Sequence, residues 1–276
     1  MSEKERADIA LVRRGLAASR EKAQAMIMAG EVYIGERKIG KASDTVRPED
    51  TFTLRGDADK YVSRGAHKLE KAVRVFDADL NGRIIMDIGA STGGFTDVCL
   101  RNGAKHVYAI DVGYGQLDWK LRNDPRVTVM ERTNARYLTP EMFAERPEIA
   151  VMDVSFISIR LILPAAFCVM GELGRMFTLI KPQFEAGRDK IGKNGVVRSA
   201  ETHEEVLSGI VRFAEESGLH VFRMDYSPIT GPEGNIEFLA EIRLKEENDS
   251  VISAEEIHRI IREAHQTLYS GSGKHD

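Results

Sequence analysis

The pattern of hydrophobic and polar positions changes near residue 60. Before that point, two helix-like stretches at 5–15 and 19–30 each end at a glycine, and short alternating runs follow in EVYIGERKIGKASDTVRPEDTFTLRG. Glycines and aspartates break these runs into short strands and turns. We therefore expect a small α+β domain at residues 1–55 and a polar linker at 56–60.

From residue 61 onward, apolar strand-like runs alternate with helical segments. A helix at 65–78 precedes the runs and another at 253–268 follows them. Strands that alternate with helices predict a doubly wound, mostly parallel sheet, here of seven strands, so residues 61–276 read as a Rossmann-like α/β domain. The predicted strands lie at 83–88, 106–111, 126–130, 149–154, 176–181, 220–226 and 237–244.

Composition adds an uneven charge to this picture. The chain is 42% hydrophobic and 30% charged, which is typical of a globular protein, and its net charge is −4. Residues 1–75 hold 16 Lys and Arg against 12 Asp and Glu, whereas the rest holds 23 against 31. A basic N-terminal region on an otherwise acidic chain indicates that this region binds a polyanion, although a solvated helix face gives the same charge count.

Cysteine usage and hydropathy point to the cytoplasm. Cys99 and Cys168 lie in apolar stretches without a CxxC pair, so we expect buried, reduced thiols. The first ten residues, MSEKERADIA, are polar and carry both signs of charge, so we expect no signal peptide. The longest apolar run, 161–170, is shorter than the roughly 20 residues that cross a bilayer. We expect no membrane partner.

A glycine-rich turn follows the first strand of the large domain, in RIIMDIGASTGGFTD at 83–97. The strand ends in Asp87, and glycines then lead into a helix, where the backbone can approach a ligand and the helix start offers free N–H groups. Asp111 ends the next strand, 22 residues after Gly89, and an acid there can bind both hydroxyls of a ribose. The turn is a candidate cofactor site.

Two details favour S-adenosyl-L-methionine over a nicotinamide dinucleotide at this turn. A carboxylate at Asp87 can face the methionine ammonium but would repel a pyrophosphate, and the spacing is D-x-G-x-x-x-G-G rather than G-x-G-x-x-G. A dehydrogenase and a turn that binds nothing stay as alternatives. The loop 112–119 can cover the adenine, although its Trp119 can equally pack on protein. The predicted cofactor contacts are Asp87, Gly89, Ala90, Ser91, Thr92, Gly93, Gly94, Phe95, Asp111, Val112, Asn134 and Asp153.

Charged residues stand at the ends of three strands and on the helix before the first strand. Asp153 and Lys181 end the fourth and fifth strands, Glu237 opens the last, and Lys68 lies on the helix. Open α/β sheets bind ligands at the C-terminal edge of their strands, so two lysines and two acids can converge on one cleft. A plain ion pair at Lys181 is the alternative.

This set of residues suits a hydroxyl acceptor. A ribose 2′-hydroxyl is a poor nucleophile and needs a base or a strong hydrogen-bond partner while it attacks a methyl group. A free lysine has a pKa of about 10.4; burial and a second cation lower that value, whereas neighbouring acids raise it. We therefore expect Lys181 to act mainly by positioning the hydroxyl.

The motifs DIGASTGGFTD, DVSFIS, LIKPQFEAGR and GNIEFL, together with YVSRGAHKLEKA, resemble those of the TlyA family of ribosomal RNA 2′-O-methyltransferases. The resemblance covers most of the chain. It implies an FtsJ-like methyltransferase domain joined to a small N-terminal RNA-binding domain, of the kind also found in a small-subunit ribosomal protein and in pseudouridine synthases. It implies cytidine ribose in 16S or 23S rRNA as the acceptor, S-adenosyl-L-homocysteine as the product, and a catalytic tetrad at Lys68, Asp153, Lys181 and Glu237. Some members are described as haemolysins, but nothing in this sequence supports pore formation or secretion.

Basic residues in two regions are candidates for contact with ribosomal RNA or ribosomal subunits. In the small domain they are Arg6, Arg13, Arg14, Arg20, Lys22, Arg37, Lys38 and Lys41. The glycine-rich loop 183–198, directly after Lys181, adds Arg188, Lys190, Lys193 and Arg198 and can close over a substrate. The alternative for both regions is a solvated charged surface. Phe156 can stack on a base or pack in the core.

Three rival functions stay open. An N-methyltransferase could use DVSF as its acceptor loop, but that loop lacks the prolines expected there, and Lys181 and Glu237 would have no role. An RNA-binding or ribosome-assembly factor with an inactive methyltransferase domain is a second. A membrane-lytic protein would need an amphipathic or apolar segment, and we find no convincing one. No His, Cys and Asp cluster has metal-ligand spacing, so we expect no metal, and a monomer is favoured.

Overall fold

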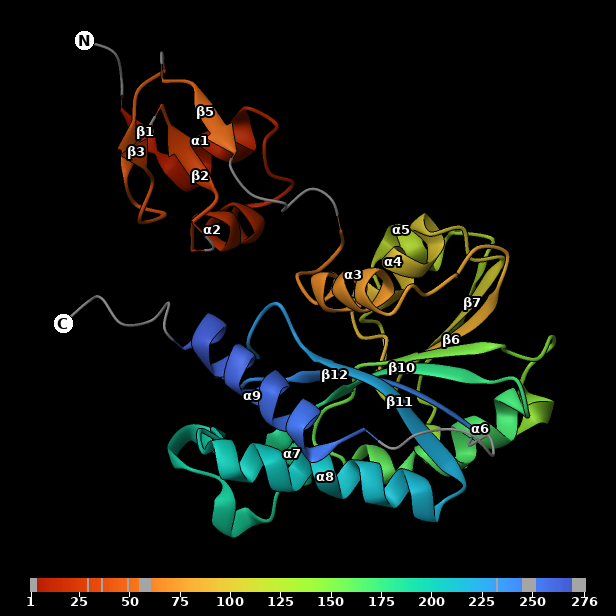
Figure 1. The fold of residues 1–276 in the computed structure, drawn as a ribbon. Coiled ribbons are helices and arrows are strands. Elements are labelled where there is room, and N and C mark those ends of the chain that lie inside the picture. Colours follow the sequence, from red (N-terminus) through yellow and green to blue (C-terminus); the bar gives the residue numbers. More distant parts are fainter. Residues whose placement is uncertain are drawn as a thin grey trace. The chain divides into compact units, whose positions relative to one another are not determined.

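The computed structural model describes residues 4–28, 30–35, 37–48, 50–54, 61–231, 233–244 and 252–269. The chain divides into two compact units, residues 1–61 and 62–276 (Figure 1). The linker expected at 56–60 lies outside the described residues. Among the described helices, none is both long enough and apolar enough to pass through a membrane.

The N-terminal unit has the small α+β fold that the sequence predicts. Two helices pack on two small antiparallel sheets, and their shared core includes Leu11, Ile27 and Val32. The first helix begins at residue 7 rather than 5, because residues 5–6 pair with 45–46 as a short strand. The elements are β1 (Glu5–Arg6), α1 (Ala7–Arg13), α2 (Arg20–Met28), β2 (Val32–Ile34), β3 (Arg37–Lys38), β4 (Thr45–Val46) and β5 (Phe52–Leu54).

The C-terminal unit contains the mostly parallel seven-stranded sheet that the sequence predicts. Its strand order is β11-β12-β10-β9-β6-β7-β8, and β12 alone runs opposite to the other six strands, since it is antiparallel to both of its neighbours. The central strands are apolar because helices cover both faces of the sheet. The strands are β6 (Ile84–Ile88), β7 (His106–Ile110), β8 (Val127–Met130), β9 (Ile149–Met152), β10 (Arg175–Ile180), β11 (Leu219–Tyr226) and β12 (Phe238–Leu244).

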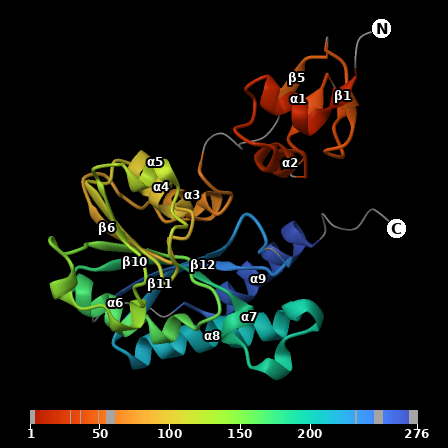
Figure 2. The same ribbon diagram turned by 180° about the vertical axis from the view of Figure 1, so that it is seen from behind.

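Helices lie on both faces of this sheet. Figures 1 and 2 show α3 (Ala66–Val75), α4 (Gly94–Arg101) and α5 (Trp119–Arg122) on one face. The opposite face carries α6 (Leu163–Met170), α7 (Pro182–Glu185), α8 (Ala200–Glu216) and α9 (Ala254–Leu268). Short 3-10 turns are η1 (Ala135–Tyr137), η2 (Pro140–Met142), η3 (Ile159–Leu161), η4 (Arg188–Lys190) and η5 (Lys193–Gly195).

The terminal helix α9 shows how the sequence directs this packing. Its buried residues Ile257, Ile260, Ile261 and Ala264 recur at helical spacing, so they form one apolar stripe against the core. The side chain of Ser253 accepts a hydrogen bond from the backbone N–H at residue 256 and caps the helix start.

One expectation about the cysteines is wrong. Cys99 is buried in α4, as expected, but Cys168 is exposed. Cys168 lies four residues after the exposed Pro164 on α6, so it shares the outward face of that helix, while its neighbours Phe167 and Val169 face the core. An apolar stretch in a surface helix still leaves one face to solvent.

The topology brings four strand ends to one edge of the sheet. The C-terminal ends of β6, β9 and β10 meet there because these strands are parallel. The first residue of β12 meets them too, since β12 is antiparallel and pairs Phe238 with Ile180 at the end of β10. Residues that follow β9 and β10, and the residue that precedes β12, must therefore lie close together.

Candidate active site

Four charged side chains meet at this edge in an alternating chain. The Lys181 Nζ lies 2.6 Å from Asp153 Oδ1, the Lys68 Nζ lies 3.3 Å from Asp153 Oδ2, and the same Nζ lies 2.6 Å from Glu237 Oε2. Lys68 comes from α3, and the other three directly follow β9, follow β10 and precede β12. The structure thus brings together all four residues that the sequence singles out for catalysis.

The cluster is largely shielded from water. Lys68, Lys181 and Glu237 are 7%, 8% and 1% exposed, and the side chain of Asp153 is 18% exposed. Burial by itself would lower the pKa of Lys68, but the charges of Asp153 and Glu237 outweigh burial and raise that pKa. Lys68 is therefore held as a cation between the two acids.

Ser155 is a member of this site that the sequence reasoning missed. The Lys181 Nζ donates a hydrogen bond to Ser155 Oγ at 2.9 Å. Lys181 thus has two partners on the loop after β9, Asp153 and Ser155. The available signal was the position of Ser155, two residues after Asp153 in the motif DVSFIS.

A cavity of about 370 Å³ opens beside the cluster, next to Asp153 and Ser155. Its walls combine apolar side chains with a few polar groups, as is usual for a small-molecule site. Six of the predicted cofactor contacts line it, namely Gly89, Ser91, Asp111, Val112, Asn134 and Asp153. Gln116, from the loop 112–119 that was expected to cover the adenine, lines it as well. Sequence reasoning missed other lining residues, namely Ile88, Ile110, Thr133, Ala135, Val154, Ser155, Ile157 and Ile162.

The glycine turn shapes this cavity through close backbone contacts. Gly89 has φ +83°, and a Cβ there would lie 2.5 Å from the backbone oxygen of Asp153. The Asp111 carboxylate accepts hydrogen bonds from the backbone N–H of Ser91 at 2.8 Å and of Gly113 at 2.7 Å. These bonds fix the carboxylate at the cavity wall, and its remaining lone pairs can accept two ribose hydroxyls.

Asp87 does not line the cavity, and it is fully buried behind the turn. Its Oδ2 accepts a 2.6 Å hydrogen bond from Thr96 Oγ1, whereas its Oδ1 has no hydrogen-bond partner among the described residues. Burial raises the pKa of Asp87 to about 7. An acid with one free oxygen can receive a cationic group, so Asp87 and Asp111 together fit the ammonium and ribose of S-adenosylmethionine.

The other predicted cofactor contacts, Ala90, Thr92, Gly93, Gly94 and Phe95, belong to the turn and the start of α4 and do not line the cavity. Gly93 and Gly94 are buried, and their neighbours leave no room for a side chain. A Cβ at Gly93 would lie 2.3 Å from Leu121 Cδ1. We infer that the four buried residues, Ala90, Gly93, Gly94 and Phe95, shape the cavity from behind, whereas Thr92 is exposed.

Two aromatic residues that the sequence left undecided are exposed. Phe156 lines the cavity and is 91% exposed, so the alternative of core packing is wrong. Trp119, at the start of α5, is 74% exposed.

Several predicted RNA-binding arginines of the N-terminal unit have protein partners. Arg6 and Arg20 both donate to Asp8 Oδ2 at 3.0 Å. Asp8 is buried, and its hydrogen bond with Arg6 holds its pKa well below the usual range. Arg13 pairs with Glu5. These arginines are thus held in place, yet the side chains of Arg6 and Arg20 keep 44% and 54% exposure.

The remaining basic candidates differ in their surroundings. Arg14 is partly buried and donates to the backbone oxygens of residues 47 and 50, which gives it a structural role. Lys190 pairs with Glu205, and the guanidinium of Arg198 lies 5.8 Å from the ring centre of Tyr269. The side chains of Arg188 and Lys193 lie outside the described residues, and the exposed ones are Lys22, Arg37, Lys38 and Lys41.

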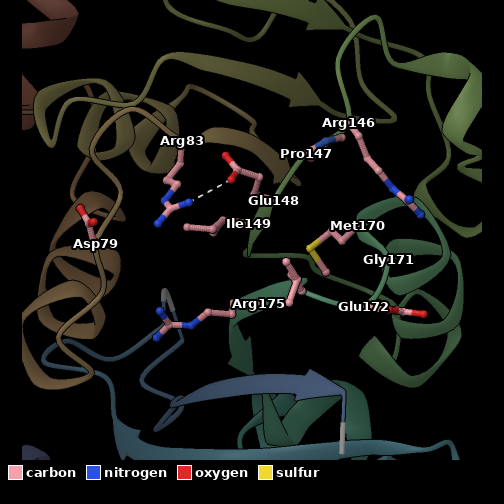
Figure 3. A pocket seen from close by; sticks show the side chains of 11 residues that line it. Asp79, Arg83, Arg146, Pro147, Glu148, Ile149, Met170, Gly171, Glu172 and Arg175 are labelled. Carbon is pink, nitrogen blue, oxygen red and sulfur yellow. Dashed lines mark hydrogen bonds and ion pairs between the residues drawn. The ribbon is translucent and has the colours of Figure 1, made fainter.

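A larger cavity of about 710 Å³ lies at the opposite edge of the sheet, where β6, β9 and β10 begin (Figure 3). Its arginines already have partners. Arg83 pairs with Glu148, Arg175 pairs with the buried Glu241, and Arg146 donates to the carbonyls that end α6. Carboxylates thus balance the charges of Arg83 and Arg175, and the Arg146 guanidinium is held by backbone oxygens. Within the described residues, no three His, Cys, Asp or Glu side chains gather in a way that could hold a metal ion.

Comparison with known proteins agrees with this geometry. The FtsJ-like methyltransferase family matches residues 61–243, and the S4 domain matches residues 5–52. A Bacillus subtilis protein, YqxC, named as a candidate rRNA methyltransferase, is 49% identical and covers 97% of this chain and 96% of its own. The 16S/23S rRNA (cytidine-2′-O)-methyltransferase TlyA of Mycobacterium tuberculosis is 44% identical, over 95% of this chain and 99% of its own.

A solved structure supports the fold as well. The structure of a candidate hemolysin from Streptococcus thermophilus matches this fold with a TM-score of 0.78. The two sequences are 44% identical, and the match covers 99% of this chain and 100% of the other.

Proposed function

We propose that this protein, a member of the TlyA family of FtsJ-like methyltransferases, is a ribosomal RNA methyltransferase. It transfers a methyl group from S-adenosylmethionine to a ribose 2′-hydroxyl, with cytidine as the acceptor nucleoside. The observation that carries this proposal is the alternating chain Lys181–Asp153–Lys68–Glu237 beside the cavity. Two lysines and two acids at one end of a cofactor-sized cavity suit a hydroxyl acceptor better than an amino group.

The cavity and the turn behind it would hold the cofactor. The Asp111 carboxylate would accept the ribose hydroxyls, and the free Oδ1 of Asp87 would balance the methionine ammonium. Apolar side chains such as Ile110 and Ile162 would contact the adenine. When bound, S-adenosylmethionine supplies an electrophilic methyl group on its sulfonium.

The charged cluster would hold the acceptor hydroxyl. Lys181 already contacts Asp153 and Ser155, which leaves its ammonium one N–H direction for a substrate oxygen. Lys68, whose raised pKa keeps it charged, would fix the other side of Asp153. A positioned proton acceptor or hydrogen-bond partner typically contributes about 10²–10⁴-fold in rate, and alignment contributes further.

The exposed basic residues of the S4 unit would bind RNA phosphates without reading its sequence. Phe156, at the mouth of the cavity, would stack on the base of the acceptor nucleotide, as aromatic side chains do with unpaired RNA bases. We infer that the protein acts in the cytoplasm, because a ribosomal RNA substrate would be met there.

The test is to incubate the protein with ribosomal subunits and cofactor that carries a tritium-labelled methyl group, then digest the RNA and map the label. Label on a ribose, at a cytidine, is the expected result. Label on a base nitrogen would instead support an N-methyltransferase. Tight RNA binding without any transfer would support an assembly factor whose catalytic domain is inactive.

A further inference from the structure

Phe156 has an unusual backbone conformation for a large residue. Its φ is +64°, in the left-handed region, where a large residue other than glycine is strained. Its ring is 91% exposed and contacts Phe184, whose ring centre lies 5.1 Å away. Burial of its own side chain therefore offsets little of the strain, and the surrounding structure must impose this conformation.

The segment that carries Lys181 imposes the conformation of Phe156 by holding both ends of the loop 154–158. At one end, Lys181 contacts Asp153 and Ser155. At the other end, Glu185 Oε2 accepts a 2.7 Å hydrogen bond from Ser158 Oγ, and its Oε1 accepts a 2.8 Å hydrogen bond from the backbone N–H of Ile159. Residues 154–158 thus lie between two anchor points, Lys181 and Glu185, which are four residues apart in sequence.

The second anchor is built into the fold rather than lying on its surface. The side chain of Glu185 is only 2% exposed, and the guanidinium of Arg160 approaches it at 3.7 Å. Two short hydrogen bonds to a buried carboxylate are stronger than ordinary surface contacts, because the partners do not exchange with water. The anchor can therefore hold the loop in a strained conformation.

The loop held in this way forms one wall of the cavity, since Asp153, Ser155, Phe156 and Ile157 all line it. An aromatic ring that is exposed at the mouth of a cavity, one residue from Ser155 and near Lys181, is suited to stack on a nucleobase. Relaxation of the loop would move this ring away from the bound nucleotide.

We propose that Glu185 is a positioning residue: through Ser158 and Ile159 it holds Phe156 in its strained conformation, so that the ring stacks on the base of the nucleotide whose ribose is methylated. This inference rests on the proposed function. Glu185 touches neither the cavity nor the charged cluster, so its effect on transfer would be indirect.

Three variants test the proposal with ribosomal subunits and the full-length protein. Glu185→Ala removes the anchor, and we expect kcat/KM for RNA to fall about 10- to 100-fold while the Kd for S-adenosylmethionine changes by less than about threefold. Glu185→Gln should restore most of the activity, because its amide oxygen can accept from Ile159 N–H and its NH2 can donate to Ser158. Glu241→Ala is the matched control, since Glu241 is equally buried but pairs with Arg175, so it should lower stability and leave kcat/KM unchanged.

A double-mutant cycle tests whether Glu185 acts through Phe156. Phe156→Gly removes the ring and the strain, so adding Glu185→Ala to it should cause no further loss. An equal loss in both backgrounds would contradict the proposal, and so would a loss confined to cofactor affinity. Wild-type rates in Glu185→Ala overturn the positioning role alone. Wild-type protein that methylates no ribose overturns the proposed function and this inference together.

Discussion

Replacement of Lys181 by methionine removes one ammonium from the charged cluster and keeps most of the side-chain volume. The lost contacts are a 2.6 Å ion pair with Asp153 and a 2.9 Å hydrogen bond with Ser155. Asp153 keeps Lys68 as a partner at 3.3 Å, so its charge is not left uncompensated. We therefore expect a stability loss of about 1–3 kcal/mol, below the 3–5 kcal/mol typical when a buried pair is broken completely.

The effect of Lys181→Met on transfer should be much larger. Loss of a group that positions or deprotonates the hydroxyl typically costs about 10²–10⁴-fold, or roughly 3–5 kcal/mol in the activation free energy. Cofactor affinity should stay within about threefold of wild type, since Lys181 does not line the cavity. Single-turnover transfer of a labelled methyl group and isothermal titration calorimetry would measure the two effects separately.

Lys71→Met is the matched control for this experiment. Lys71 lies on α3, its side chain is 11% exposed, and its Nζ pairs with Asp225 at 3.1 Å, outside the charged cluster. It should lose stability to a similar degree and transfer at the wild-type rate. Wild-type transfer in Lys181→Met, or an equal loss in Lys71→Met, would refute the role assigned to Lys181.

Three further predictions follow from burial and backbone geometry. The pKa of Asp87 is about 7, so its carboxylate becomes ionised as the pH rises through 7. Cofactor affinity should strengthen over the same range and be about fivefold weaker at pH 6 than at pH 7. Calorimetry on Asp87→Asn should show weak binding that does not depend on pH in this way. Gly89→Ala should lose about 2 kcal/mol or more in urea unfolding, together with cofactor binding, because its Cβ meets the backbone of Asp153. Burial, aided by the nearby His265, lowers the pKa of His203 to about 4. The neutral imidazole therefore contributes fully to stability above pH 6.5, and about 3 kcal/mol of that stability is lost by pH 4. The variant His203→Gln should lose less stability between pH 6.5 and pH 4 than the wild type, and an unchanged pH dependence would count against this assignment.

Local patterns in the sequence were enough to predict the elements and the cofactor side of the site. Only the backbone within a few residues decides three features: the apolar run that ends in Asp87, the glycine turn after it, and the position of Asp111 at a strand end. Strand and helix periodicity likewise depends on near neighbours, which is why the seven strands and the amphipathic α9 could be predicted. The same patterns placed Asp153 and Lys181 at one edge, because parallel strands share their C-terminal ends.

The sequence also predicted that Lys68 and Glu237 join this edge, but local patterns could not show which of the four side chains touch. That Lys68 reaches Asp153 across 85 residues, and that Glu237 joins them, depends on the strand order and on the antiparallel register that pairs Phe238 with Ile180. The buried Asp8 that holds Arg6 and Arg20, and the anchor at Glu185, have the same origin.

The amino-acid sequence alone therefore determined which chemical groups this protein brings to its site and on which elements they lie. Only the tertiary structure decided which of those groups touch, which are shielded from water and which side chain stands exposed at the cavity mouth. The physical reason is that periodicity and turns are set by short-range sterics and hydrogen bonds, whereas ion pairs and pKa shifts depend on distances of a few ångströms between segments that packing alone brings together.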